Sequence, residues 1–291
     1  MIDSATSDRI LARLSRALAW PAAHLRPLRV GDAVAGWIDD ARAERLAGFS
    51  EVFRVNGESV AFIPRLDNPD ARSAAVAAVA ATLASEGALT AWRDELYAVG
   101  PAFDAAPWFV LERAAARYFG VHTWAVHVNG VVGGVDRASI WFARRSPGKA
   151  IAPGMLDNLV GGGIRAGTGA AETLLREAWE EAGIPPELAR DARPAGTVHI
   201  RRSQPDGLQW ETIFVNDLWL PGGFVPANQD GEVVAQRLVD IDEAARLIGV
   251  TGGPDEVTAD ASLVVLDFLL RHGALPSDAP NYVQLDGLRH T

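Results

Sequence analysis

The segment that most restricts the fold of this chain is a glycine-rich loop that runs directly into a helix rich in glutamate. It spans residues 161–184 and reads GGGIRAGTGAAETLLREAWEEAGI. Thr168 is a candidate N-cap, because a threonine hydroxyl can accept a hydrogen bond from a free N–H group at the start of a helix. Gly183 is a candidate terminating residue, since glycine tolerates a positive φ. The sequence therefore predicts a short helix between two local end signals.

The predicted helix has one acidic face. At about 100° per residue, Glu177, Glu180 and Glu181 fall within an arc of roughly 100°, while Trp179 lies with the apolar residues on the side expected to be buried. Glu177 and Glu181 are one turn apart, so their oxygens could converge on a divalent cation. Arg176 is one turn from Glu180 and could orient it. A charged helix face alone is usually only solvated, so the spacing of the whole segment decides its meaning.

That spacing resembles the Nudix box, G-x5-E-x7-R-E-U-x-E-E-x-G-U, in which U is aliphatic. From Gly162 to Ile184 the chain keeps the glycines, the arginine and the three helix glutamates. Ala178 is smaller than the usual aliphatic residue, and Thr168 stands where the family has its first glutamate. In the family that glutamate pairs with the box arginine, so Arg176 needs another acidic partner on the helix. The candidates are Glu172 and Glu180.

The resemblance implies a magnesium site, with Mn²⁺ as the alternative metal. Glu177 and Glu181 would be the principal ligands, Glu180 a further or water-mediated ligand with a catalytic role, and the carbonyl of Gly161 a backbone ligand. Arg176 would support catalysis by orienting these groups. The metal would neutralise charge on a diphosphate and lower the pKa of a bound water that attacks phosphorus.

The general base is left open by this resemblance, because the family takes it from the helix or from a downstream loop. Glu232, which follows an Asp-Gly turn, is the loop candidate, and an ordinary acid in a turn is the alternative. Arg144, Arg145 and Lys149 would suit the substrate diphosphate, since arginine can bind two phosphate oxygens at once. Taken singly, each could also be a surface charge.

Several other stretches resemble a narrower group of Nudix proteins, found with thiamine pyrophosphokinase domains and in a plant branch. They are residues 92–97, 111–114, 141–149, 153–159, 218–221 and 230–233. Members of this group hydrolyse thiamine diphosphate analogues, particularly oxo and oxy forms, to monophosphates. The resemblance therefore makes such a small-molecule diphosphate the leading expected substrate.

Three other functions are associated with a sequence of this kind. Isopentenyl-diphosphate isomerases share the fold but use a cysteine, and this chain has none. A Nudix hydrolase of ADP-ribose or a dinucleotide carries the same box. A noncatalytic Nudix ligand-binding module would fit the loss of the glutamate at Thr168, although the retained glutamates favour an enzyme.

The expected fold is α/β: a Nudix α/β/α sandwich with a mixed sheet, preceded by a small α+β domain. Asn56-Gly57 suits a tight turn between two strands, and the alanine-rich stretch 71–81 favours a helix. A helical pattern over 111–119 stops at Gly120 and places the domain boundary near residue 118. The predicted division is therefore 1–118, 119–272, and a surface extension at 273–291.

The second domain is predicted to contain alternating strands and two late helices. A second hairpin is expected at Asn129-Gly130, where a strand from 121 to 128 ends. The expected strands are 139–145, 197–202, 211–220 and 233–238, and the expected helices are 241–248 and 259–272.

The histidines and tryptophans give few further indications of site residues. His127 and His199 lie in strand patterns, where a structural histidine is the safer interpretation. Among nine tryptophans, Trp210 is an open candidate for stacking on a substrate ring.

Composition excludes several partners. The formal net charge of −10 disfavours nucleic acid, because nonspecific binding to a phosphate backbone needs excess lysine and arginine. The apolar stretches are shorter than the roughly 18 residues of a spanning helix, so no membrane partner is expected. The N-terminal residues lack the pattern of a secretory signal, and a cytoplasmic location is expected. Nothing in the sequence indicates the oligomeric state.

Overall fold

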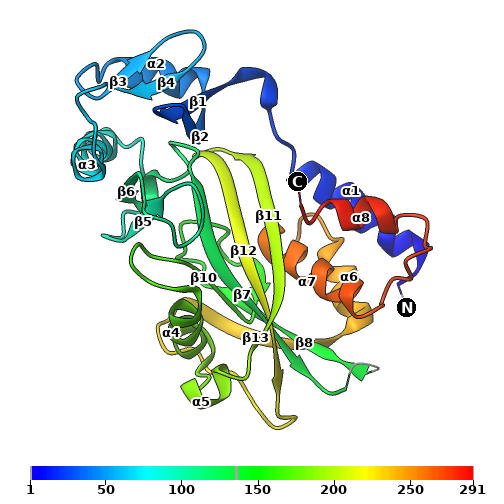
Figure 1. The fold of residues 1–291 in the computed structure, drawn as a ribbon. Helices are drawn as coiled ribbons and strands as arrows, with labels where there is room; N and C mark the ends of the chain where they lie inside the picture. The colour runs from blue at the N-terminus through cyan, green and yellow to red at the C-terminus, as the bar shows by residue number, and fades with distance from the viewer. Residues whose placement is uncertain (1, 135–136, 291) are drawn as a thin grey trace.

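The computed structural model describes residues 2–134 and 137–290, and its largest feature is a seven-stranded mixed sheet (Figure 1). The strand order is β11-β12-β7-β8-β13, with β10 paired to β7 and β9 to β8. Only the β12–β7 pair is parallel within this sheet. The strands are β7 (His122–Val132), β8 (Ser139–Arg145), β9 (Leu156–Asn158), β10 (Val160–Gly163), β11 (Arg193–Gln204), β12 (Gly207–Leu220) and β13 (Val233–Asp240).

Helices cover both faces of this sheet. Along β7, Val126 and Val128 pack into the core beneath α4 (Ala170–Ala182) and α5 (Pro186–Ala189). Ala125 and Val131 belong to the opposite core, beneath α6 (Ile241–Ile248) and α7 (Ala259–Arg271). Successive strand residues face opposite sides of a sheet, so one strand serves two apolar layers. The expected α/β/α sandwich with a mixed sheet is confirmed.

The N-terminal region forms a second unit with its own core. Its four-stranded sheet has the order β2-β1-β4-β3, and its core is a separate apolar cluster. Asn56-Gly57 joins β3 to β4 as an antiparallel hairpin, as predicted. Its elements are η1 (Ala22–His24), β1 (Leu25–Val30), β2 (Ala33–Asp39), α2 (Asp40–Ala47), β3 (Phe53–Val55), β4 (Val60–Phe62), α3 (Pro69–Ser85), β5 (Leu96–Val99) and β6 (Phe109–Glu112).

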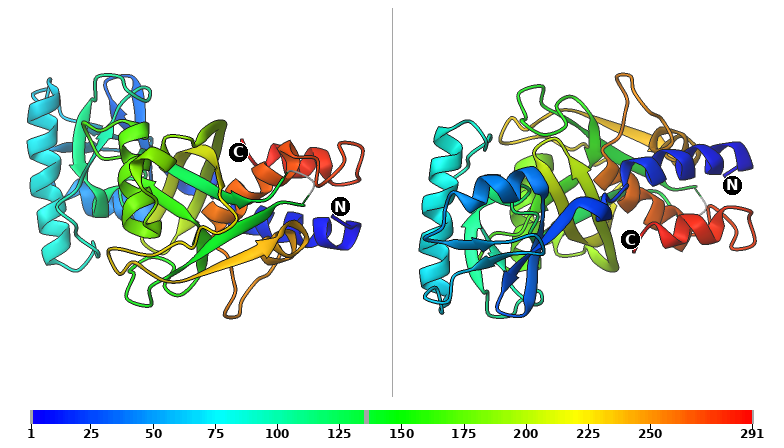
Figure 2. Two further views of the ribbon diagram at one scale, coloured as in Figure 1. Left: turned by 90° about the horizontal axis from the view of Figure 1, so that it is seen from below. Right: turned by 90° about the horizontal axis from the view of Figure 1, so that it is seen from above.

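The two ends of the chain lie together, away from α3 (Figure 2). In α1 (Ser4–Ala17), Ile10 and Leu14 are fully buried in the core that contains α6 and α7. Near the C-terminus, Leu285 of α8 (Tyr282–Gly287) is buried in the same core. The expected division grouped residues 1–118 and made 273–291 a surface extension. The structure instead packs both terminal helices on the large sheet unit, because their apolar faces complete its core.

Two local predictions were wrong. The stretch predicted as a helix over 111–119 begins in strand β6, followed by the 3-10 helix η2 (Arg113–Ala115). The carboxylate of Glu112 accepts hydrogen bonds from the N–H groups of Arg93, Glu95 and Ala114, so pairing with the neighbouring segment replaces helical bonds.

The hairpin predicted at Asn129-Gly130 is also absent, since β7 continues to Val132. Asn129 is fully buried and donates to Asp217 at 3.0 Å. A Cβ at Gly130 would overlap the side chain of Leu159. The Asn-Gly pair therefore serves packing within the sheet and does not form a turn.

Among the described residues, no helix is long and apolar enough to cross a membrane.

A modest loss of stability is expected when the N-cap of α6 is removed. Asp240 Oδ1 accepts from the N–H of Glu243 at 2.7 Å, and an alanine leaves that N–H without its side-chain acceptor. Asp240→Ala should lower the free energy of unfolding by about 1 kcal/mol in urea titration. Asp278→Ala, in an exposed turn, is the matched control; equal losses in the two variants would contradict the capping role.

Candidate active site

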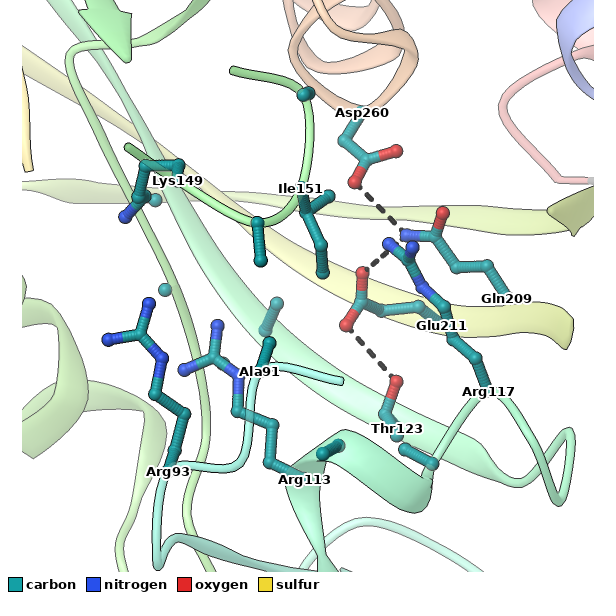
Figure 3. A pocket seen from close by; sticks show the side chains of 18 of the residues that line it. Ala91, Arg93, Arg113, Arg117, Thr123, Lys149, Ile151, Gln209, Glu211 and Asp260 are labelled. Atoms are coloured by element: carbon teal, nitrogen blue, oxygen red, sulfur yellow. Dashed lines mark hydrogen bonds between the residues drawn. The ribbon is translucent and has the colours of Figure 1, made fainter. Parts of the chain in front are cut away.

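A cavity of about 490 Å³ lies between the N-terminal unit and the large sheet. This is within the usual range for small-molecule sites, roughly 300–1,000 Å³. Its walls include α4, the glycine strand β10, the segment before β5, the residues after β6 and the start of β12. Figure 3 shows side chains of both units pointing into it. The acidic helix thus borders a site that two units build together.

Of the two end residues predicted for α4, the structure confirms one. Gly183 has a φ of 61° and ends the helix, as predicted. The N-cap is Gly169, without a side-chain hydrogen bond. The Thr168 hydroxyl donates to the carbonyl of Arg165 at 2.9 Å. The prediction of Thr168 as N-cap was therefore wrong by one residue, because its hydroxyl stabilises the preceding turn.

The packing of α4 corrects the expected position of Trp179. The buried stripe consists of Thr173, Leu174, Ala178 and Ala182, together with Glu181. Trp179 is 49% exposed. The spacing of these small side chains brings the helix close to the sheet along a narrow stripe, and the indole lies outside it. Trp179 contributes to neither the core nor the cavity wall.

Glu181 and Glu177 lie against the glycine strand. Glu181 is 6% exposed, and one of its oxygens accepts the N–H of Gly161 at 2.8 Å. Burial, with the nearby charge of Glu177, raises the pKa of Glu181 well above its ordinary value. Burial also raises the pKa of Glu177. A Cβ at Gly162 would overlap the carboxylate of Glu177, so glycine is what admits this acid.

This pair fits a divalent cation. Two carboxylates one turn apart are hard oxygen donors. Burial raises the pKa of both, with the charge of Glu177 adding to the effect on Glu181 and the charge of Glu180 adding to the effect on Glu177. A cation between them would relieve both costs, as bound metal ions do elsewhere. The carbonyl of Gly161, the expected backbone ligand, belongs to the residue whose N–H Glu181 already binds.

The third acid of the predicted metal set is turned aside. Arg176 binds Glu180 at 3.0 Å and Glu177 at 2.8 Å. Across residues 2–134 and 137–290, no three His, Cys, Asp or Glu side chains gather into a ready metal cluster. With threonine at position 168, Arg176 pairs with Glu180, one of its two expected partners, and also with Glu177 of the proposed metal pair.

The predicted phosphate-binding cations divide between two faces of β8. Arg144 donates to the carbonyl of Gly154 at 2.9 Å, pairs with Asp255, and does not border the cavity. Arg145 borders the cavity and pairs with Asp157 at 2.7 Å. Adjacent strand residues point to opposite sides, so only one of the two arginines can face the site. Lys149 also borders the cavity.

Glu232 is held between cations. Its carboxylate accepts hydrogen bonds from Lys149 and, at 3.3 Å, from Arg93. Burial alone would raise the pKa of Glu232, but the hydrogen bond and charge of Lys149, with the charge of Arg93, keep the pKa below its ordinary value. The loop acid is therefore at the site and ionised, in a double ion pair.

The N-terminal unit contributes residues that the sequence did not indicate. Arg93, Arg113 and Tyr97 all border the cavity. Glu95, 9% exposed, pairs with Arg113 at 3.2 Å and with Arg165 at 3.0 Å. Their stretches, 92–97 and 111–114, carry part of the resemblance to the narrower Nudix group, but that resemblance did not place these side chains at the site. The packing of β5 and β6 against the glycine loop brings them to the acidic helix.

A buried polar cluster forms the other end of the cavity. The amide of Gln209 donates to Glu211 and to Asp260, each at 3.0 Å. Thr123 donates to Glu211 at 3.1 Å (Figure 3). Arg202 pairs with Asp260 at 3.1 Å. This end therefore combines two carboxylates with the donor groups of Gln209, Arg117 and Arg202.

The tryptophan and histidine rings that the sequence singled out contact other protein side chains. Trp210 borders the cavity, but its ring stacks on His122 at 4.6 Å, on the sheet face opposite to its strand neighbour Glu211. Burial lowers the pKa of His122 to about 4. His127 is 7% exposed and bonds Asn158 at 2.7 Å. His199 lies 5.9 Å from the ring of His290. None of these rings is a free stacking platform.

Comparison with known proteins covers both units. A family model described as "NUDIX domain" matches residues 122–261, and one described as "Domain of unknown function (DUF4743)" matches residues 10–123. The chain is 37% identical over 261 residues to Nudix hydrolase 24, chloroplastic, of Arabidopsis thaliana, covering 89% of this chain and 71% of that protein. It is 36% identical over 269 residues to Nudix hydrolase 20, chloroplastic, of the same plant, with the same two coverages. A solved structure of DR0079 from Deinococcus radiodurans is 21% identical, covers 59% of this chain and 97% of that chain, and has a TM-score of 0.44.

Proposed function

The chain belongs to the Nudix hydrolase family, and on that premise we propose that it is a Mg²⁺-dependent hydrolase of thiamine diphosphate analogues. The preferred substrates would be oxothiamine and oxythiamine diphosphate, and the product a monophosphate. The observation that carries the proposal is the polarity of the cavity. Glu177 and Glu181, which fit a metal, lie at one end with Arg93, Arg113 and Lys149, and the Glu211–Gln209–Asp260 cluster lies at the other end with Arg117 and Arg202.

The acceptor cluster supports a ring with N–H donors. Each of the two half-buried carboxylates already accepts from side chains of the cluster, but its remaining lone pairs can accept a further hydrogen bond from an N–H group of the ligand. The pyrimidine rings of thiamine and its oxy analogue both carry N–H groups. The adenine amino group of ADP-ribose would also fit, so this end alone does not separate the two substrate classes.

The residues can be given distinct roles in the reaction. Glu177 and Glu181 would hold Mg²⁺, which when bound supplies charge neutralisation and a more acidic water. Arg176 positions Glu180 through the 3.0 Å ion pair. Glu180 pairs with one cation and Glu232 with two, so Glu180 is the better candidate to take the proton of the attacking water. The water oxygen bonds to phosphorus as the bridging P–O bond breaks.

The test is turnover of a substrate panel with and without Mg²⁺. It contains thiamine, oxothiamine and oxythiamine diphosphates, ADP-ribose and NADH. We expect the highest kcat/KM on oxothiamine and oxythiamine diphosphates and no turnover after chelation. Turnover of ADP-ribose or NADH alone would keep the hydrolase and reject the thiamine assignment. Binding without any metal-dependent turnover would favour a ligand-binding module, consistent with the departure at Thr168.

A further inference from the structure

Three cationic side chains from two units meet in one part of the cavity. Arg93 lies just before β5 and Arg113 just after β6, both in the N-terminal unit. Lys149 comes from the loop after β8 in the large sheet unit. In Figure 3 the charged ends of all three point into the same space. A unit outside the catalytic fold therefore delivers two guanidinium groups to the site.

The anions that these cations contact are shared. One carboxylate, Glu232, accepts from both Lys149 and Arg93. One buried carboxylate, Glu95, serves both Arg113 and Arg165. In each of these two groups, two cations share one carboxylate. An anionic ligand would give the shared cations a further partner.

The two arginines are held on a rigid support. The N–H of Ala166 donates to the carbonyl of Leu96 at 2.7 Å. Tyr97, 6% exposed, packs its hydroxyl against Gly163. The β5–β6 hairpin is therefore fixed to the glycine loop that precedes α4, and groups on fixed elements are positioned accurately for a ligand.

We propose that Arg93, Arg113 and Lys149 form a subsite for the terminal phosphate of a monosubstituted diphosphate, and that Glu232 occupies this place in the free protein. A terminal phosphate carries up to two negative charges and three free oxygens, which suits two guanidinium forks and one ammonium group. On binding, the phosphate replaces the carboxylate of Glu232 as the partner of Arg93 and Lys149.

This subsite would distinguish a diphosphate with a terminal phosphate from one without it, which the metal site does not do. In ADP-ribose and in NADH each of the two phosphates carries one ester bond and the shared anhydride bond, so neither is a terminal phosphate. A monosubstituted diphosphate such as a thiamine diphosphate analogue has one. The inference rests on the proposed hydrolase function and deepens it, by assigning the choice of substrate class to the N-terminal unit.

The test compares Arg93→Gln and Arg113→Gln with Arg65→Gln as matched control. Arg65 lies in the same unit, pairs with Glu51 and is 61% exposed. The probe is methylenediphosphonate, which is not hydrolysed, titrated calorimetrically in the presence of Mg²⁺. We expect each site variant to bind it about tenfold more weakly than the control. The KM for oxythiamine diphosphate should rise by a similar factor with little change in kcat, while the KM for ADP-ribose stays the same.

The outcomes separate this inference from the proposed function. Probe affinities of both site variants equal to that of Arg65→Gln would overturn the subsite, even if the wild type hydrolyses the substrate panel. Equal rises in KM for oxythiamine diphosphate and ADP-ribose would also overturn it. Arginine-dependent probe binding by a protein without turnover would support the subsite and reject the hydrolase. Arg93 is 45% exposed, so its variant should fold normally.

Discussion

Glutamine in place of Glu181 is expected to lower kcat by at least about a thousandfold, the size of effect seen when a main electrostatic contributor to a transition state is removed. The buried carboxylate would lose its charge and its capacity to hold the metal with Glu177. Its contact with the main chain would survive, since the glutamine carbonyl can still accept the N–H of Gly161. The substitution therefore removes the charged metal ligand and leaves the fold intact.

The same variant should respond differently to pH in the absence of metal. The pKa of Glu181 in the folded protein lies well above its ordinary value of 4.5, chiefly because of burial. The contribution of Glu181 to stability is fully present below pH 4.5, where the carboxyl is protonated in both states. Between pH 4.5 and the raised pKa, Glu181 is ionised only in the unfolded chain, so the free energy of unfolding falls as pH rises through this interval. Glu181→Gln lacks this titration, so its free energy of unfolding should fall less than that of the wild type over that interval.

Two measurements check these effects of Glu181. Turnover is measured at saturating Mg²⁺, and thermal melting is followed with and without Mg²⁺ at several pH values. Glu172→Gln, on the exposed first turn of the same helix, should keep both turnover and the stabilisation by Mg²⁺. Turnover of Glu181→Gln within tenfold of the Glu172→Gln control would remove Glu181 from the metal site.

The catalytic helix could be predicted because its determinants are local. Its acids lie at spacings of three and four residues, and Gly183 ends it with a positive φ. The three expected glutamates and Lys149 all border one cavity. Short sequence separation made these relations visible without knowledge of the tertiary structure.

The predictions that were wrong, or that were missing, depend on tertiary contacts. Whether Arg144 or Arg145 faces the cavity depends on which face of β8 meets α4, and the sequence of the strand does not specify this. Trp179 is exposed because α4 approaches the sheet along its small residues. Arg93 and Arg113 reach the site through the docking of a separate unit, so the resemblance of stretches 92–97 and 111–114 to the narrower Nudix group did not show that these two side chains face the cavity.

Gly163→Ala should test that docking directly, with a loss of about 3 kcal/mol in the free energy of unfolding, near the upper end of overpacking effects. A Cβ at this position would overlap the hydroxyl of Tyr97. Since Tyr97 is 6% exposed within the core of the N-terminal unit, the ring has little space to withdraw. The hairpin would have to move away from β10, carrying Arg93 and Arg113 with it. A misplacement of this kind, about 1 Å, should lower kcat/KM about a hundredfold.

A double-mutant cycle attributes the effect to this one contact. Tyr97→Phe removes the overlapping hydroxyl and leaves the ring carbon Cζ, which would lie 2.7 Å from the added Cβ, so it should relieve part of the strain. Gly163→Ala should then cost less in the phenylalanine background than in the wild type, both in unfolding and in kcat/KM. Additive losses would show that the two side chains do not interact, and that the alanine acts through β10 itself. A non-additive result in both measurements would mean that the seating of the N-terminal unit on the glycine loop controls how well the phosphate subsite is formed.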